Sequence, residues 1–566
     1  MSAYKSAIIG LLAAGISGTA GAIVSSNTGT NAFDGMSLND FIGANRFYAA
    51  GYTGSRSVLA SIEGGHVWSG HETLGQVSTF LDARQLLQGL GVDAGRMGEF
   101  DDHATMVATV AAGRGSLGYQ QGIAHGAQLW SGAIATSFGQ GTSFNWNSGW
   151  AFTQPYATAL LTGVAGRQAD VVNSSWGGRW SLAGDSAFSL ALDGMARASG
   201  KTVVFSAGNN GPTTNTVNSP GSGYNSIIVG ALGNDLDAYR QVAGLSSRSP
   251  SDYSGPDGFV AGVRARVDLV APGTNITTAY YGGTTGGNAG GSDPSNGANN
   301  WYRRDAEGTS FAAPMVAGGV ALLNDLAYDR FAGSQASRNG QVIKAVLLNS
   351  ARKIEGWDNG QSLGGDGVLR TSQALDWTSG AGALDLNAAF DQFASGDHDL
   401  AGLGGGSISQ LGWDYASVAQ DGEVVYSFSQ ALSANQHLSA TLNWFVGRSY
   451  EGVLDDGSLS ASDQFFTDLA LQVWRKNGPG SSVLVAESDA KYLNTEHLSF
   501  DLAAAGEYFI VVDWKGERYD LVGNSLQSFG LAWSVSAVPE PASALLLLVG
   551  LAGVFSLGRR AAARPH

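Results

Sequence analysis

Short, almost continuously hydrophobic runs alternate with helical patterns between residues 55 and 275. The runs are SVLASI, AQLWSGAIA, DVVNSSW, TVVFSAGN, SIIVGAL and VDLVAPG, and strands that are covered on both faces are hydrophobic in this way. Between them lie segments such as SAFSLALDGMARASG, whose apolar spacing fits a helix packed on a sheet. The alternation predicts a doubly wound, mostly parallel α/β sheet, in which functional sites gather at the carboxyl ends of the strands.

The pattern changes after the glycine-rich stretch GLGGGSIS, residues 402–409. Strand patterns such as EVVYSFSQ, HLSATLNWFVG and EYFIVVDW then follow one another with Gly and Asn turns between them. This succession of strands and turns predicts an all-β sandwich over residues 398–536, which follows an α/β domain over residues 38–397. Residues 280–300 are rich in Gly, Ser and Asn, so we expect a surface loop there.

Composition excludes several classes of function. The 566-residue chain has a formal net charge of −16, and it contains no cluster of Lys and Arg that could contact phosphates, so we expect no nucleic-acid partner. The absence of cysteine from the sequence excludes disulfides, thiolate metal sites and thiol nucleophiles.

The first residues have the features of a signal peptide. Lys5 precedes an apolar stretch, and small residues end it at Ala20 and Ala22, so we expect residues 1–22 to direct export and to be removed. Residues 23–37 then form a short N-terminal segment before the α/β domain.

The last residues, 537–566, have three parts in a characteristic order. These are Pro539, Glu540 and Pro541, an apolar run over 542–558, and Arg559 with Arg560. One interpretation is a single membrane anchor. The order also resembles the PEP-CTERM sorting signal of Gram-negative bacteria, which implies an exosortase-type sorting machinery, transient attachment to the membrane, and delivery to the cell surface, the extracellular matrix or the medium.

Four polar residues stand where hydrophobic elements begin or end. Glu63 ends the run SVLASI, His103 begins the helical pattern HATMVATVAAG, Asn209 follows the strand VVFSAG, and Ser310 enters the apolar helix SFAAPMVAGGVALL. A serine at a helix start places its hydroxyl beside free N–H groups, which stabilise negative charge on a bound carbonyl oxygen. Taken singly, a buried histidine, a capping serine and a turn asparagine have ordinary structural explanations.

Together these stretches resemble the subtilisin-like serine peptidases. GTSFAAP corresponds to the family's nucleophile motif, HATMVA to its histidine motif, SAGN to its oxyanion motif and DVVNSSWGG to its substrate-pairing strand. The resemblance covers residues 38–392 and keeps the acid, His, Ser order along the chain. It implies a subtilisin-like fold and an exported serine endopeptidase that acts on polypeptides without a required cofactor, while structural calcium is permitted.

The resemblance assigns a role to each residue. Ser310 attacks the scissile carbonyl, His103 accepts and returns the proton, and Asn209 with the Ser310 N–H holds the oxyanion. The family has Asp where this chain has Glu63, whose extra methylene adds about 1.5 Å of reach, and hydrolases on other folds use either acid. Asp101 and Asp102 are rival acids, but neighbours of His103 rarely project towards its ring.

Two further sets of residues lie close to these motifs in the sequence. Ser175, Trp176 and Gly177 of the substrate-pairing strand, with Ala207 and Gly208 of the oxyanion loop, are expected to contact substrate, although Trp176 fits core packing equally well. His66, His71 and Glu72 match no zinc spacing, so we expect a structural role and no metal site.

Other interpretations stay open at the level of sequence. A noncatalytic surface or matrix protein could reuse the same sheet, with Glu63 as a relic of lost chemistry, and the same site could serve peptide ligation or ester hydrolysis. The sandwich is similar to the jelly-roll or pre-peptidase C-terminal domains appended to secreted proteases.

Overall fold

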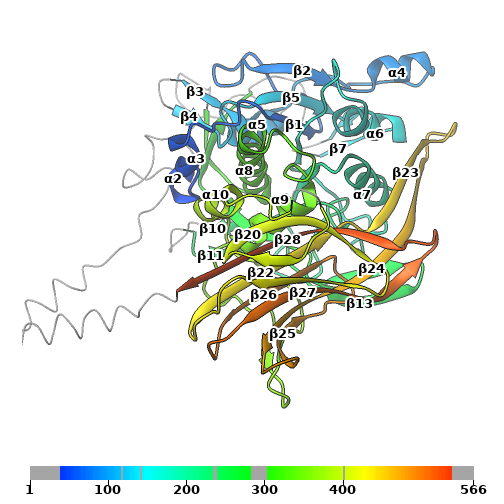
Figure 1. Ribbon diagram of the computed structural model, residues 1–566. Helices are drawn as coiled ribbons and strands as arrows, with labels where there is room; N and C mark the ends of the chain where they lie inside the picture. Colours follow the sequence, from blue (N-terminus) through cyan, green and yellow to red (C-terminus); the bar gives the residue numbers. More distant parts are fainter. Residues whose placement is uncertain are drawn as a thin grey trace, which may run out of the picture.

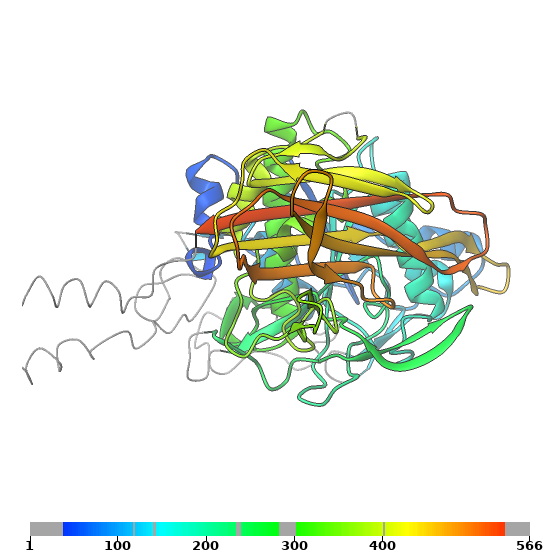
Figure 2. The ribbon, with the colours of Figure 1, turned by 60° about the horizontal axis from the view of Figure 1, so that its bottom comes forward.

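The structure is a computed structural model that describes residues 38–116, 119–139, 143–233, 239–281, 302–399 and 402–537. An α/β unit is followed by a strand-rich unit that lies across one side of it (Figures 1 and 2). The expected signal peptide 1–22, the segment 23–37, nearly all of the glycine-rich loop 280–300 and the tail after Ala537 lie outside the described residues.

The α/β unit is built on one mostly parallel sheet. Its order is β11-β10-β9-β8-β1-β5-β2, with β14 beside β10 and only β11 antiparallel to its neighbour. The bounds are β1 (Val58–Glu63), β2 (Val77–Leu81), β5 (Gln128–Ala133), β8 (Val171–Ser174), β9 (Thr202–Ser206), β10 (Ile227–Gly233), β11 (Gln241–Val242) and β14 (Leu269–Pro272). Six of these are the hydrophobic runs predicted as strands, and every residue of β1, β8 and β9 is buried.

The order of the strands places a crevice beside β1. Strands β5 and β2 lie on one side of β1, whereas β8, β9 and β10 follow on the other side. Ligands bind outside the carboxyl ends of parallel strands where the order reverses in this way. Glu63 is the last residue of β1 and pairs in register with Ala133, so it lies at that edge.

Helices cover both faces of the sheet. They are α5 (Asp102–Ala112), α6 (Gly149–Ala157), α7 (Ala187–Ser199), α8 (Thr309–Arg330), α9 (Gly340–Asn349) and α10 (Leu386–Ala394). The shorter helices are α2 (Leu38–Phe41), α3 (Asn45–Ala49), α4 (Arg84–Gly89) and the π-helical turn η2 (Thr158–Thr162). Helix α8 packs on α5 and on the strands β8, β9 and β10 (Figure 1).

Helix α8 is apolar around most of its first five turns, which pass through the core. By length and composition it is the one helix in the described part of the chain that could cross a membrane, yet its most apolar 18-residue window is completely buried inside the protein. A helix that is hydrophobic all round is either a core helix or a membrane span, and the burial identifies α8 as a core helix.

The strand-rich unit consists of two packed sheets. The larger has the order β17-β18-β25-β24-β27-β21-β19 with β23 beside β24, and the smaller has the order β20-β28-β22-β26. Their bounds are β17 (Ser362–Leu363), β18 (Leu369–Arg370), β19 (Gly406–Ile408), β20 (Leu411–Ala419), β21 (Glu423–Phe428), β22 (Gln436–Trp444), β23 (Gly447–Val453), β24 (Leu459–Lys476), β25 (Ser482–Ser488), β26 (Thr495–Asp501), β27 (Tyr508–Asp520) and β28 (Leu526–Ala537). The predicted succession of an α/β sheet and a strand-rich region is confirmed.

One hairpin crosses the expected boundary at residue 397. Strands β17 and β18 precede that residue, yet β18 pairs in parallel with β25, with Leu369 beside Ala486. Each of these strands has only two residues, without a hydrophobic run, so the sequence pattern did not reveal them. Small two-stranded sheets complete the α/β unit: β3 (Arg114–Ser116) with β4 (Tyr119–Gln121), β6 (Ser137–Phe138) with β7 (Phe144–Asn145), β12 (Ser251–Gly255) with β13 (Gly258–Arg264), and β15 (Ile276–Ala279) with β16 (Tyr302–Ala306).

Buried charges connect the two units. The Arg448 guanidinium of β23 lies 2.8 Å from the Asp193 carboxylate of α7 and 2.9 Å from the Asp463 carboxylate of β24. The Arg448 side chain is 0% exposed. Two acids and the Gly184 carbonyl therefore compensate one buried cation, and the removal of one partner of such a pair leaves the other charge uncompensated.

We expect Arg448→Met to lower the free energy of unfolding by about 3–5 kcal/mol, because it leaves the buried Asp193 carboxylate and the partly buried Asp463 carboxylate without their cation. The midpoint of thermal unfolding, followed by circular dichroism, checks this. Arg370→Met, which breaks an exposed pair with Asp366, is the matched control and should leave the midpoint unchanged. Equal thermal unfolding midpoints for Arg448→Met and Arg370→Met would show that the buried ion pairs of Arg448 do not stabilise the fold more than an exposed pair does.

Candidate active site

The acid at the end of β1 is buried and bonded on both oxygens. Glu63 is 0% exposed, its Oε2 lies 3.1 Å from Nδ1 of His103, and its Oε1 accepts a 2.7 Å hydrogen bond from the Ser175 backbone N–H. Burial raises the pKa of the Glu63 carboxyl above its ordinary value, although both hydrogen bonds act in the opposite direction. The Glu63 side chain, which is one methylene longer than that of aspartate, thus reaches the His103 ring.

Two glycines after Glu63 leave room for close approaches of the chain. A Cβ on Gly64 would lie 2.7 Å from the Phe144 ring, and a Cβ on Gly65 would lie 2.7 Å from Cβ of Asp101. Any side chain at either position would push apart the segments that surround the acid.

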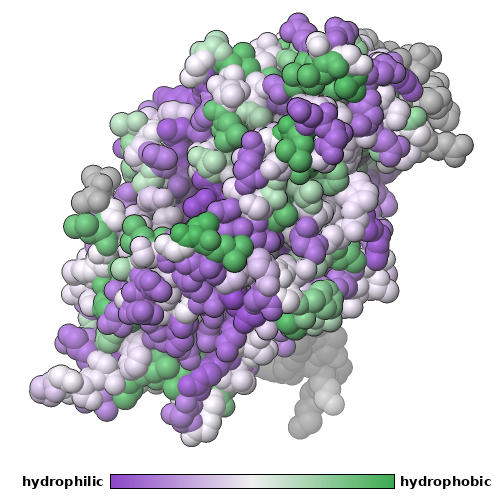
Figure 3. All heavy atoms as spheres, turned by 90° about the vertical axis from the view of Figure 1, so that its right-hand side faces the viewer, coloured by the Kyte–Doolittle hydropathy of each residue, from purple (hydrophilic) through white to green (hydrophobic). Residues whose placement is uncertain are grey.

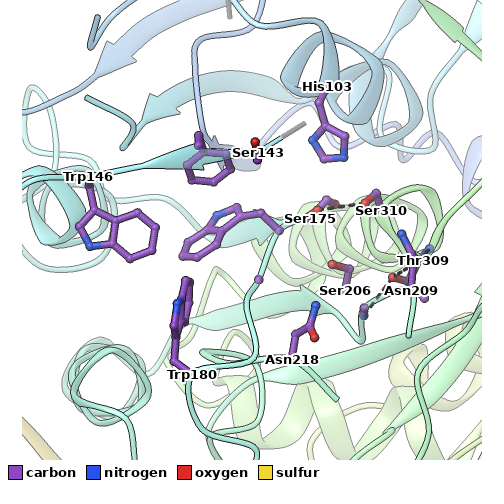
Figure 4. A pocket seen from close by; sticks show the side chains of 14 residues that line it. His103, Ser143, Trp146, Ser175, Trp180, Ser206, Asn209, Asn218, Thr309 and Ser310 are labelled. Atoms are coloured by element: carbon purple, nitrogen blue, oxygen red, sulfur yellow. Dashed lines mark hydrogen bonds between the residues drawn. The ribbon is translucent and has the colours of Figure 1, made fainter. Parts of the chain in front are cut away.

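The histidine projects from the first turn of α5 into a cavity (Figure 4). A carboxylate only accepts hydrogen bonds, so Nδ1 of His103 donates to Glu63 and Nε2 is left to act as a base. Burial lowers the pKa of His103, but the hydrogen bond and charge of Glu63 outweigh it, with help from Asp101 and Asp102, and the pKa is raised above its ordinary 6.5.

The serine lies at the start of the buried helix α8, across the cavity from His103. Ser310 is the second residue of α8, and its Oγ donates a 3.0 Å hydrogen bond to the Ser175 carbonyl (Figure 4). The helix is entered through Gly308 at a φ of 144°, which favours glycine, and a Cβ there would also lie 3.1 Å from Nδ2 of Asn209. The glycine therefore permits Ser310 and Asn209 to lie close together.

Asn209 is held with its amide oxygen towards α8. Oδ1 accepts hydrogen bonds from the backbone N–H of Thr309 at 2.9 Å and from its hydroxyl at 3.0 Å, and that hydroxyl accepts a bond from the Gly208 N–H. With the oxygen fixed, the NH₂ group is oriented towards the cavity that Asn209 and Ser310 both line. It is placed to donate to an oxyanion there.

The cavity has a volume of about 260 Å³ and contains most of the predicted substrate contacts. Ser175, Trp176, Gly177 and Gly208 line it. Ala207 does not, because it is fully buried and its backbone bonds to Val229 and Asn218. Ser175 has a position that the sequence did not reveal, since its N–H bonds Glu63 and its carbonyl bonds Ser310.

The end of the cavity away from His103 is aromatic (Figure 4). We call Phe144, Trp146, Trp176 and Trp180 the aromatic wall. Ring centroids are 5.6 Å apart for Trp146 and Trp176 and 5.3 Å for Trp146 and Trp180. Trp176 is 7% exposed and donates to the Ile62 carbonyl, so it serves both packing and the cavity, whereas Trp180 is 53% exposed. The clustered tryptophans in NWNSGW and WGGRW were the available signal for this wall.

The rival acids have other partners. Asp101 caps α5 by accepting from the Ala104 N–H. Asp102 accepts a 3.1 Å bond from the Tyr281 N–H, and burial raises its pKa to about 6. Glu63 is the carboxylate that bonds the His103 ring.

The other histidines near the site bond within the fold. His66 lies between Ser131 and Asp82, and His71 accepts from the Thr73 N–H. Over the described ranges, no group of three or more His, Asp and Glu side chains is arranged to hold a metal ion.

Comparison with known proteins identifies the α/β unit. Residues 92–370 match the sequence pattern of the Subtilase family, peptidase S8. This stretch, just under half of the chain, is therefore similar to a subtilase domain. The match includes His103, Asn209 and Ser310 but begins after Glu63.

Related proteins are named proteases. A subtilisin of Bacillus sp. strain TA39 is 31% identical over 224 residues, which are 39% of this chain and 46% of that protein. The minor extracellular protease Vpr of Bacillus subtilis is 33% identical over 253 residues, 43% of this chain and 29% of that protein. Pyrolysin of Pyrococcus furiosus is 29% identical over 259 residues, 42% of this chain and 16% of that protein. The chain thus spans less than half the length of these relatives, and their names support the predicted serine endopeptidase class.

We expect Glu63→Gln to lower the pKa of His103, because it removes the negative charge that offsets burial of the imidazole. The chain contains eight histidines, so isotope labelling of histidine alone gives a simple NMR spectrum. The resonance of His103 is identified because it is missing from the spectrum of His103→Ala. Its titration by NMR should give a pKa above 6.5 in the wild type and a lower pKa in Glu63→Gln. Glu72→Gln, an exposed acid outside the cavity, is the control and should match the wild type; no difference among the three would exclude an ionised Glu63 beside the ring.

Proposed function

We propose that this chain is an exported serine endopeptidase that hydrolyses polypeptides through an acyl-enzyme, with Glu63 in place of the family's aspartate. The observation that carries the proposal is the hydrogen bond between the buried Glu63 and His103, in a cavity that also contains Ser310 and Asn209. An acid that orients a histidine, a serine at a helix start and a fixed amide are the parts that acyl transfer requires.

The reaction begins when the Ser310 side chain turns from the Ser175 carbonyl towards Nε2 of His103. Oγ attacks the scissile carbonyl carbon while its proton passes to Nε2, and the carbonyl oxygen becomes an oxyanion between the Asn209 NH₂ and the Ser310 N–H. The intermediate collapses, the C–N bond breaks, and Nε2 returns the proton to the leaving amine. A water then attacks the acyl-enzyme in the same way and releases the acid product and Ser310.

Glu63 does not take up a proton in these steps. It accepts from Nδ1, keeps Nε2 directed at the cavity, and stabilises the imidazolium that forms when His103 is protonated. The second hydrogen bond, from the Ser175 N–H, holds the longer side chain in one position. Because His103 is the base only in its neutral form, kcat/KM is expected to rise with pH through its raised pKa.

The shape of the cavity supports a preference for apolar side chains. The aromatic wall is closely packed ring against ring and partly exposed, and it lies in the same cavity as Ser310. A large apolar side chain of a bound polypeptide would lose its contact with water against these rings.

Export and sorting complete the proposal. The signal peptide 1–22 and the PEP-CTERM-like tail 537–566 would carry the protein out of a Gram-negative cell by an exosortase-type route, and the proposed reaction needs no cofactor. The secreted proteases among the relatives are consistent with an exported enzyme. The noncatalytic alternative is not favoured, because the relatives are named proteases and the Glu63 to His103 contact is intact.

We expect a fluorophosphonate probe to label the wild-type protein on Ser310 and not to label Ser310→Ala. Asn209→Ala should retain the nucleophile but lower kcat for peptide hydrolysis by about 10²–10³, with a smaller change in KM, because the Asn209 NH₂ is proposed to bond the oxyanion and not the ground-state carbonyl. That magnitude comes from a subtilisin, so here it is a family expectation. Labelling rates and steady-state kinetics on a quenched peptide measure both effects.

A folded wild-type protein that resists labelling would contradict the proposed activity. Asn210→Ala is the matched control, which tests whether the loss of activity is specific to Asn209. The kcat of Asn210→Ala should remain close to that of the wild type. Equal losses in the two asparagine variants would contradict the assignment of Asn209.

A further inference from the structure

One hairpin of the strand-rich unit reaches across to the substrate side of the subtilase domain. Strands β23 and β24 are antiparallel, with Tyr450 opposite Ala461 and Val453 opposite Leu459, and residues 454–458 form the turn. The hairpin runs alongside α6 and α7 at the right of Figure 1. It belongs to the region predicted as an appended sandwich, so its position beside these helices was not expected.

The tip of the hairpin bonds the start of α6. The Gly149 N–H donates a 2.7 Å hydrogen bond to the Gly457 carbonyl. A Cβ on Gly149 would lie 2.7 Å from Cδ2 of Leu459 and 2.8 Å from the Gly457 oxygen. The absence of a side chain at the first residue of α6 therefore lets the hairpin come this close.

The base of the hairpin is fixed on α7. Arg448 pairs with the buried Asp193, and a Cβ on Gly194 would lie 2.6 Å from the Tyr450 nitrogen. The Arg197 guanidinium lies 5.0 Å from the centre of the Phe465 ring. The hairpin is thus held to both helices by hydrogen bonding, charge and close packing.

The same two helices support the aromatic wall from behind. Phe152 of α6 lies 5.4 Å and Phe188 of α7 lies 5.2 Å, between ring centroids, from Trp146. Phe152 also contacts Trp176 at 6.0 Å. Trp146 itself stands three residues before Gly149, the residue bonded by the hairpin. A displacement of α6 or α7 would therefore move the wall.

The outer surface of the hairpin is polar and internally bonded. Glu451 accepts hydrogen bonds from Ser449, Ser460 and Ser462, and these bonds lower the pKa of Glu451. Figure 3 looks onto this side of the molecule, where hydrophilic residues dominate and hydrophobic residues are scattered. The hairpin directs its packing contacts inward, towards α6 and α7.

We propose that the β23–β24 hairpin is a positioning element for the substrate cavity. It holds the aromatic wall through α6 and α7 and thereby sets the preference for a large apolar substrate side chain. Its residues do not touch the reacting atoms, so it acts on selectivity and leaves the chemistry at Ser310 alone. The inference rests on the proposed peptidase function.

The test removes the tip and keeps the base. Residues 451–460 are replaced by Asn-Gly, a two-residue turn that joins the opposed Tyr450 and Ala461 and retains Arg448. Gly149→Val is a second variant, which displaces the hairpin from the side of α6 without substituting any residue of the hairpin or of the aromatic wall. The control shortens the exposed turn 477–481 between β24 and β25, which lies at the other end of β24.

Matched peptides that differ by one Phe→Ala change are hydrolysed by each protein. The wild type should prefer Phe at the position that meets the wall, and both test variants should lose about tenfold or more of that preference, mainly through a higher KM for the Phe peptide. Hydrolysis of the Ala peptide and the rate of fluorophosphonate labelling should stay close to wild type, and the control should retain the preference. An unchanged preference in both test variants, or an equal loss in the control, would overturn the proposal.

A second measurement separates this proposal from the proposed function. Amide hydrogen exchange should become faster in residues 143–157 of the shortened variant and stay unchanged around Glu63 and His103. Absence of activity in the wild type would refute the peptidase function, while unchanged exchange over 143–157 would refute the positioning role.

Discussion

The buried carboxylate of Glu63 is the contact on which the site depends. It lies at the end of β1, and its two oxygens bond the first turn of α5 through His103 and the segment after β8 through Ser175. The Ser175 carbonyl in turn accepts from Ser310 at the start of α8. A carboxylate with no exposure to water needs such partners, so the same bonds that compensate its charge bring Glu63, His103 and Ser310 to one edge of the sheet.

The Glu63 side chain is accommodated by what surrounds the strand end. Phe144 closes over Gly64, and Asp101 lies against Gly65, so the chain leaves β1 through a narrow passage. The longer acid extends from this point to His103 at 3.1 Å. Close packing around the two glycines therefore fits a glutamate, whose side chain has one methylene more than that of aspartate. The second hydrogen bond, from the Ser175 N–H, keeps the side chain from adopting other rotamers.

The sequence predicted the parts of this protein that depend on local patterns. Continuous hydrophobic runs identified β1, β8 and β9, and Glu63, His103, Asn209 and Ser310 were recognised where elements begin or end. The role of Ser175, the burial of Ala207, and the strands β17 and β18 were not predictable in this way, because they arise from contacts between segments far apart in the chain. The aromatic wall and its hairpin have the same origin, since Gly149 and Gly457 are brought together only by packing of the two units.

The most direct test of the account is a crystal structure of the protein inactivated by a peptidyl phosphonate. The account predicts a covalent bond from Ser310 Oγ to phosphorus, a phosphoryl oxygen within about 2.7–3.1 Å of the Asn209 NH₂ and the Ser310 N–H, and Glu63 still bonded to Nδ1 of His103. A structure in which Ser310 is unmodified and remains bonded to the Ser175 carbonyl, or in which Glu63 has turned away from His103, would contradict it.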